Sequence, residues 1–163
     1  MKRRLLLAAF VLAAGSAGAA DLAPMPALKG TTLDGRAYEL AARRGRVVMV
    51  MLWRSDCAVC IDKLPELRAN AQGWKSAPFD LVLINLDAAA GDAEAYEHVR
   101  RVVAPNEASV FSFWQGHVEM PTAWRQAARL PHTLLVDRQG ALVGWHQGRV
   151  PPDAWNQVAD LLP

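Results

Sequence analysis

The stretch Val47–Leu67, VVMVMLWRSDCAVCIDKLPEL, decides the fold. Its first seven residues are continuously apolar, which is typical of a strand buried on both faces of a sheet. From Cys57 the spacing becomes helical, because positions 57, 60, 61, 64, 67 and 71 are apolar or cysteine and share one face. We therefore predict a buried strand over 47–53 and a helix that begins at Cys57, with Cys60 one turn in on its buried face. Pro65 should kink this helix, because it lacks an N–H group and crowds the preceding turn.

The segments on either side of this stretch alternate between strand and helix patterns. Asp34-Gly35 separates two short alternating runs within 27–40, which predicts a β-hairpin. Further strands are expected at 79–86, 109–114, 132–137 and 141–148, the last two joined by a turn at 137–140. Helices are expected at 92–103 and 122–129, and after Pro152, with an apolar stripe at 155, 158, 161 and 162. This order predicts an α/β sandwich around one sheet.

The first twenty residues, MKRRLLLAAFVLAAGSAGAA, have the order of a secretory signal peptide. A basic start precedes an apolar run over 5–14, and small residues at 17–20 follow. A run of about ten residues is short of the roughly 20 that cross a bilayer. We therefore predict a signal peptide over 1–20 and a mature domain over 21–163 in the periplasm or an equivalent exported setting, soluble after cleavage. An uncleaved N-terminal anchor is the alternative.

Removal of this leader changes the charge balance of the chain. The leader holds three of the 18 Lys and Arg residues and none of the 16 Asp and Glu residues, so 15 basic residues remain against 16 acidic ones. No strongly basic patch is left, and the sequence offers no argument for nucleic acid as a partner. The oligomeric state is not indicated by any heptad pattern.

Cys57 and Cys60 are the only cysteines of the chain, and three kinds of chemistry use such a pair. As a structural staple, a four-residue loop would add only about 2 kcal/mol in the chain-entropy estimate. A zinc site needs about four ligands, and no histidine shows ligand spacing with the pair, so no metal is expected. A redox pair needs a strand that delivers it to an exposed helix N-terminus, where the helix dipole stabilises a thiolate. The sequence supplies that arrangement. Cys57 would be the nucleophile and Cys60 the resolving cysteine, with their redox-active disulfide in place of a cofactor.

Three segments resemble the exported TlpA/ResA-like (DsbE-like) proteins of the thioredoxin fold, relatives of the reductases of cytochrome c maturation. The lead PALKGTTLDGRAYELAARRGRVVMVMLW is similar to the hairpin and central strand of that family. WRSDCAVCIDKLPEL is similar to its Trp-x-x-x-Cys-x-x-Cys start, and LPHTLLVDRQGALVGWHQG to its proline loop and last hairpin. Together they cover most of residues 24–150.

The resemblance implies a thioredoxin-like sandwich, with a central mixed β-sheet flanked by helices and an N-terminal β-hairpin. It also implies that Pro131 is cis, lies against the disulfide and offers the backbone of its neighbours to an extended substrate peptide. The function it implies is reduction of protein disulfides, of the cytochrome c maturation type or similar, with a membrane electron-donor protein to recharge the pair. The same fold run as a disulfide oxidant or isomerase is the first alternative.

Three positions depart from the family pattern. Asp56 directly precedes the pair where many relatives have an aromatic residue, and Lys63 stands where some have a glutamate. Met51 occupies the strand position at which thioredoxins bury an aspartate that assists proton transfer. The proton acceptor for Cys60 is therefore open, with water, Asp56 and Asp62 as candidates. As an acid at a helix start, Asp56 or Asp62 is equally well explained by the helix dipole.

The residues next to the pair bear on its redox direction. The intervening Ala-Val carries no charge, and Asp56 should raise the pKa of Cys57 by repulsion, with Arg54 and Lys63 as partial offsets. This balance favours a reducing pair.

His132, beside Pro131, is a candidate to tune Cys57 or to bind Cu(I) with both thiols, as a copper-handling metallochaperone would. Trp53 and Trp114 are candidates for a peptide-binding surface, although the six tryptophans are expected mostly in the core.

Overall fold

A central sheet of five strands is built around the predicted buried strand β3 (Val47–Trp53). The computed structural model describes residues 25–104 and 107–163, so the predicted signal peptide over 1–20 lies outside the described residues. The strand order is β5-β4-β3-β7-β8, with β4 at Phe79–Asn85, β5 at Val110–Trp114, β7 at His132–Val136 and β8 at Leu142–Gln147.

The sheet is mixed because its two halves are connected differently. β3, β4 and β5 run parallel to one another, while β7 is antiparallel to β3 and β8 is antiparallel to β7. Parallel neighbours need a crossover, which α1 (Ala58–Gly73) and α2 (Gly91–Val103) provide. The hairpin between β7 and β8 turns at Gly140, whose φ of 88° favours glycine.

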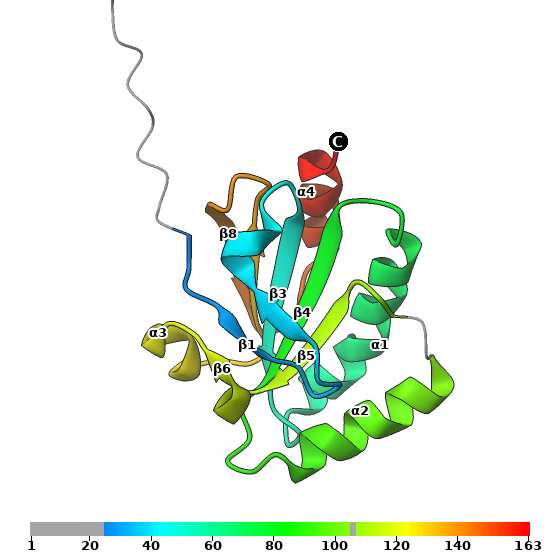
Figure 1. Ribbon diagram of the computed structural model, residues 1–163, viewed down its shortest axis with the longest axis vertical. Helices are drawn as coiled ribbons and strands as arrows, with labels where there is room; N and C mark the ends of the chain where they lie inside the picture. Colours follow the sequence, from blue (N-terminus) through cyan, green and yellow to red (C-terminus); the bar gives the residue numbers. More distant parts are fainter. Residues whose placement is uncertain (1–24, 105–106) are drawn as a thin grey trace, which may run out of the picture.

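A second, smaller sheet lies in front of the central sheet in Figure 1. The predicted hairpin forms its strands β1 (Lys29–Thr31) and β2 (Ala37–Glu39). The third strand is β6 (Val118–Glu119), which pairs with β1 and has too few residues to show a pattern in the sequence. Short 3-10 helices lie at Leu40–Arg43 and Gln115–His117.

The helices α1 and α4 (Asp153–Leu161) cover the opposite face of the central sheet (Figure 1). α1 continues through Pro65 as one helix, and its buried residues include Cys60, Leu64 and Leu67. The short helix α3 (Thr122–Arg125) stops four residues before the predicted end at 129. No helix among the described residues has both the length and the apolar character needed to span a membrane.

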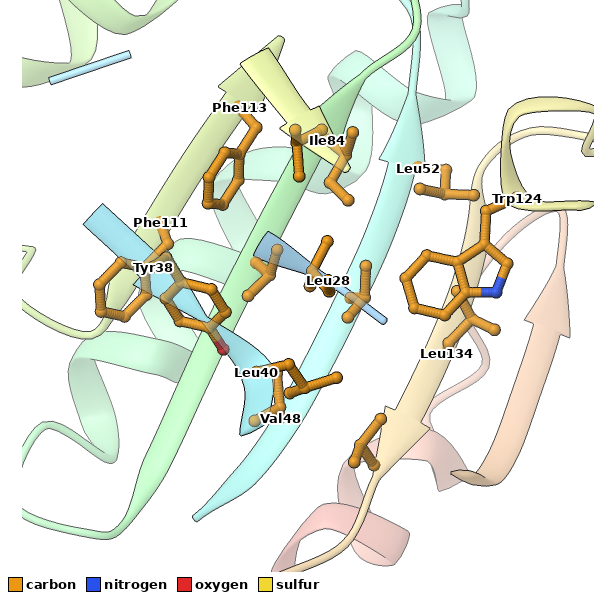
Figure 2. Close-up of a cluster of buried hydrophobic side chains, with 14 of the residues drawn as sticks. Leu28, Tyr38, Leu40, Val48, Leu52, Ile84, Phe111, Phe113, Trp124 and Leu134 are labelled. Carbon is orange, nitrogen blue, oxygen red and sulfur yellow. The ribbon is translucent and has the colours of Figure 1, made fainter. Parts of the chain in front are cut away.

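Each face of the sheet has its own hydrophobic core. Figure 2 shows the cluster between the two sheets, where Tyr38 lies against Phe111 and Trp124 covers Leu134 and Leu52. On the other face, odd-numbered residues of β3, including Met51 and Trp53, pack against Cys60 and the rest of α1. The alternation of β3 between two cores explains why all seven of its residues are buried. The architecture confirms the predicted thioredoxin-like α/β fold.

Two apolar positions are more exposed than predicted. Ile61 is 37% exposed, although the sequence predicted it on the buried face of α1. It lies at the margin of the apolar stripe of this helix, whereas Cys60 and Leu64 lie at its centre. Trp145 is 61% exposed, so the expectation that the tryptophans lie mostly in the core is wrong for it. Of the other five, Trp53 and Trp124 are buried and Trp74, Trp114 and Trp155 are half-buried.

Buried charge also joins the helices to the sheet. Arg68 of α1 is only 2% exposed and donates hydrogen bonds to Glu97 of α2, to Glu107 and to Ser112 of β5. The two carboxylates compensate the charge of a guanidinium that would otherwise be costly to bury. This cluster is far from obvious in the sequence, because its members come from four separate segments.

Candidate active site

Cys57 and Cys60 form a disulfide at the point where β3 ends and α1 begins. Cys57 is the N-cap residue of α1, with extended φ and ψ of −93° and 95°. Its Sγ accepts a hydrogen bond from the backbone N–H of Cys60 over 3.2 Å, in the way that a serine or threonine oxygen does at other N-caps. The sulfur that the sequence assigned as the nucleophile therefore sits at the positive end of the helix dipole.

The two sulfur-bearing residues differ in accessibility. Cys57 is half-buried, whereas Cys60 has no exposed surface and belongs to the cluster that includes Met51, Trp53 and Leu64. Trp53 is itself 2% exposed and packs against Tyr96 of α2, with ring centroids 5.4 Å apart. Trp53 therefore supports the pair from the core and contributes no surface for a peptide.

Two carboxylates and one guanidinium lie together at the loop that precedes Cys57. Arg54 Nε lies 3.2 Å from Asp56 Oδ1 and 3.8 Å from Asp87 Oδ1. The side chain of Asp56 is 72% exposed, so both solvent and Arg54 screen its charge. Arg54 is therefore paired with Asp56, whereas Lys63 is paired with Glu66.

Asp87, two residues after the end of β4, anchors the loop that precedes the pair. It accepts hydrogen bonds from the backbone N–H and the hydroxyl of Ser55 and from the side-chain amide of Asn85. Burial alone would raise the pKa of Asp87, but these hydrogen bonds and the nearby Arg54 hold it below its ordinary value. An ionised Asp87 thus fixes the backbone two residues before Cys57.

The peptide bond between Leu130 and Pro131 is cis, the conformation that the resemblance implies. Pro131 is buried, and its carbonyl accepts a hydrogen bond of 2.8 Å from the N–H of Gly148 after β8. Leu130 packs against the same hydrophobic cluster that Cys57 and Cys60 contact.

His132 follows this loop and lies flat against Trp145, with an interplanar angle of 5° and ring centroids 6.2 Å apart. Burial lowers the pKa of His132, which favours a neutral imidazole near pH 7. A neutral ring next to the proline loop supplies no positive charge to Cys57. Trp145, which is exposed beside His132, was not singled out by the sequence, because the register that brings the two rings together is visible only in the structure.

Lys63 is buried on α1 and donates hydrogen bonds of 2.7 Å to both carboxylate oxygens of Glu66. Glu66 also accepts a hydrogen bond from Trp155 Nε1 of α4. The bond from Lys63 holds the pKa of Glu66 below its ordinary value. These three residues join α1 to α4, so Lys63 has a structural partner and does not offset Asp56.

Within residues 25–104 and 107–163, no three His, Cys, Asp or Glu side chains gather closely enough to hold a metal ion.

Comparison with known proteins identifies this arrangement. The Redoxin family matches residues 19–162. A structure assigned as the thiol:disulfide interchange protein DsbE of Chlorobium tepidum is 27% identical, with a TM-score of 0.65 over 83% of this chain and 92% of that one. A thioredoxin-family thiol:disulfide interchange protein of the same organism is 17% identical, with a TM-score of 0.67 over 88% and 97%.

An exposed lipoprotein thioredoxin of Streptococcus pneumoniae is 19% identical, with a TM-score of 0.60 over 81% of this chain and 96% of that one. At such identities the last two likenesses show the fold alone. The family match covers most of the chain and includes the Cys57–Cys60 pair, which confirms the resemblance seen in the sequence. The chain therefore belongs to the Redoxin family and is a thiol-disulfide oxidoreductase of the thioredoxin fold.

Proposed function

We propose that the protein is an exported reductase of protein disulfides, with Cys57 as nucleophile and Cys60 as resolving cysteine. The observation that carries this proposal is the unequal burial of the pair, because Cys57 is half-buried and Cys60 has no exposed surface. A partner disulfide can reach only Cys57. The second sulfur can then act only on a mixed disulfide that Cys57 has already formed.

The helix N-terminus supports the first step. In the reduced protein, the Cys57 thiolate keeps the hydrogen bond from the N–H of Cys60 and faces the positive end of the α1 dipole, which lowers the pKa of the thiol. The thiolate attacks one sulfur of the substrate and expels the other as a thiolate. Cys60 then attacks Cys57, which releases the second substrate sulfur and leaves the Cys57–Cys60 disulfide.

The proline loop supports docking of an extended substrate segment. The carbonyl of Pro131 is already bonded to Gly148, whereas Leu130 takes no part in the turn and loop hydrogen bonds of the described chain. The backbone of Leu130 is thus available to a substrate strand beside the disulfide. Exposed apolar side chains of Val59, Ile61 and Trp145 provide contacts for an unfolded or extended partner.

The charges around Cys57 support the reducing direction. Asp56 opposes thiolate formation, Arg54 offsets part of that effect, and His132 is held neutral by burial. Ala58 and Val59 between the cysteines add no charge. Asp56 and His132 are proposed to tune Cys57 in this way, and Trp53 to hold the pair in place from the core. A strongly oxidising pair needs extra stabilisation of its thiolate, and these residues do not supply it.

The proposals of export and of a membrane electron donor rest on the sequence and on the family resemblance. The basic, apolar and small-residue order of 1–20 is that of a signal peptide. A reductase in an oxidising compartment needs electrons from outside it, and the family resemblance points to a membrane protein as their source. A role of the cytochrome c maturation type, with apocytochrome thiols as the product, fits the same resemblance.

The reduction potential of the Cys57–Cys60 couple in residues 21–163 tests the direction. Equilibration against thiol buffers should give a value near or below about −250 mV, whereas a value near about −120 mV would make the protein an oxidant. Two variants test the roles of the cysteines. Cys57→Ser should abolish reduction of a protein disulfide, and Cys60→Ser should accumulate a mixed disulfide through Cys57. Wild-type turnover by Cys57→Ser would refute the proposal.

A further inference from the structure

The buried position of Cys60 raises the question of where its proton goes. Cys60 has no exposed surface and lies in an apolar cluster, and such burial raises the pKa of a thiol. It must nevertheless become a thiolate to resolve a mixed disulfide. The carboxylates suggested by the sequence lie in solvent, since the side chains of Asp56 and Asp62 are 72% and 66% exposed and each pairs with an arginine. Another acceptor has to serve the interior.

Three residues form a row across the sheet on the face that Cys60 contacts. Thr133 of β7 is the direct partner of Met51 on β3 and of His146 on β8. Directly opposed residues on neighbouring strands project to the same face, with Cβ atoms about 4.5–5.5 Å apart. Met51 and Cys60 belong to the same buried cluster, so this face is the one covered by α1. The thioether of Met51 cannot accept the proton at neutral pH.

The other two members of the row have polar atoms without partners. Thr133 is 1% exposed, and its Oγ1 is buried and makes no hydrogen bond within the described chain. His146 Nε2 is also buried and unpaired, although the residue as a whole is half-buried. Buried polar atoms that lack protein partners are usually satisfied by an ordered water. Thr133 and His146 are direct cross-strand partners, which places both side chains on one face of the sheet for a shared water.

We propose that Thr133 and His146, through a bound water, carry the proton of Cys60 to solvent. This proposal rests on the dithiol exchange proposed above. The Cys60 thiol gives its proton to the water, which Thr133 Oγ1 holds, and the water gives a proton to His146 Nε2. The imidazolium releases the proton from Nδ1 to solvent. The Cys60 thiolate then attacks Cys57, the new sulfur–sulfur bond forms, and the substrate leaves as a thiolate with the electron pair.

The charges on the neighbouring elements are largely compensated. On α1, Lys63 is paired with Glu66, and Asp62 is paired with Arg149 of the loop that follows β8. α4 brings Asp153 at its exposed first turn, and His132 projects from β7 to the other face of the sheet. His146 Nε2 is the proton-accepting atom that the row itself supplies.

Stopped-flow measurements with an aromatic disulfide can separate the attack by Cys57 from the attack by Cys60, because each attack releases one coloured thiolate. With reduced protein and 5,5′-dithiobis(2-nitrobenzoate), the first release reports attack by Cys57 and the second reports attack by Cys60. Thr133→Val and His146→Gln should slow the second release at pH 7 about tenfold or more and leave the first unchanged. Thr133→Ser should restore the second release, and His98→Ala on the exposed face of α2 should have no effect.

The pH profile distinguishes proton transfer from a packing defect. The rates of the variants and of the wild type should converge above about pH 10, where bulk hydroxide removes the thiol proton. A slowing of equal size at every pH would mean that Cys60 is merely misplaced, and it would overturn the proposal. An unchanged second release in both variants would do the same. If the wild type gave no first release, or Cys57→Ser still gave one, the proposed nucleophile itself would be wrong.

Discussion

Arg54 Nε lies within 4 Å of carboxylate oxygens on both Asp56 and Asp87, so one guanidinium lies between the acid that precedes Cys57 and the acid that anchors its loop. The arginine therefore affects the pair in two ways. It screens a charge that disfavours the Cys57 thiolate, and it helps to keep Asp87 ionised.

Removal of the Asp56 charge should make Cys57 more acidic. We expect Asp56→Asn to lower the pKa of the Cys57 thiol by less than about one unit, because the carboxylate is exposed and already screened. Arg54→Gln should raise that pKa. The pH dependence of alkylation by iodoacetamide measures both shifts, with Glu39→Gln on β2 as the control. A lowered pKa in Arg54→Gln would contradict the assigned role.

The hydrogen bonds to Asp87 should make the fold sensitive to acid. The pKa of Asp87 is lower in the folded protein than in the unfolded chain, so its contribution is complete above about pH 4 and is lost as the pH falls through the folded value. Asp87→Asn should lower the free energy of unfolding by about 1–2 kcal/mol at pH 7. Urea denaturation should show this difference shrinking toward pH 3. A constant difference across that range would contradict the ionised, hydrogen-bonded state.

Loss of Arg68 should be the most destabilising of these changes. Arg68→Met leaves the buried Glu97 without its guanidinium partner and the half-buried Glu107 with Arg100 alone, and we expect it to cost about 3–5 kcal/mol at pH 7. Burial raises the pKa of Glu97, with Arg68 opposing the rise. The stabilising contribution of a group with a raised pKa is complete below its unfolded value, near 4, and is lost as the pH rises through its folded value.

The penalty in Arg68→Met should therefore decrease toward pH 4, where Glu97 takes up a proton. The double variant Arg68→Met with Glu97→Gln should recover part of the lost stability at pH 7. Chemical denaturation at pH 7 and pH 4 provides the measurement. A double variant no more stable than Arg68→Met would show that packing, and not unpaired charge, causes the loss.

The exposed Trp145 should contribute to substrate binding and little to stability. Trp145→Ala should raise the KM for an unfolded protein disulfide roughly 3- to 10-fold, about 1 kcal/mol, because it removes an aromatic surface beside the proline loop. Reaction with a small aromatic disulfide should stay unchanged. Val143→Ala, at another exposed apolar position of β8, is the matched control. An equal rise in KM in both variants would show that β8 as a whole, and not Trp145 in particular, contributes to substrate binding.

The fold was largely predictable because its strongest signals are local. The continuous apolar run of β3 and the helical spacing after Cys57 each lie within one short segment, and the structure places both as expected. The hairpin at Asp34-Gly35 was readable for the same reason. By contrast, β6 has two residues and exists only because β1 is beside it.

The surroundings of the pair were harder to predict, because they arise from long-range pairing. The contact of Arg54 with Asp87 joins residues 33 positions apart in the sequence, and the row of Met51, Thr133 and His146 exists only in the register of three strands. The cis bond before Pro131 was implied by the family resemblance, since a proline at a strand start is ordinarily trans. Periodicity identifies buried faces but does not identify which partners meet there.

The unequal burial of the two cysteines also bears on how the protein tolerates peroxide. An oxidant that enters from solvent meets Cys57 first and converts its thiolate to a sulfenic acid. Cys60, held one helical turn away and shielded, can condense with that sulfenic acid, expel water and return the pair to the ordinary disulfide. Further oxidation to the sulfinic acid would have to outpace this reaction within a single molecule. The same geometry that orders the exchange steps should therefore protect the protein from irreversible oxidation.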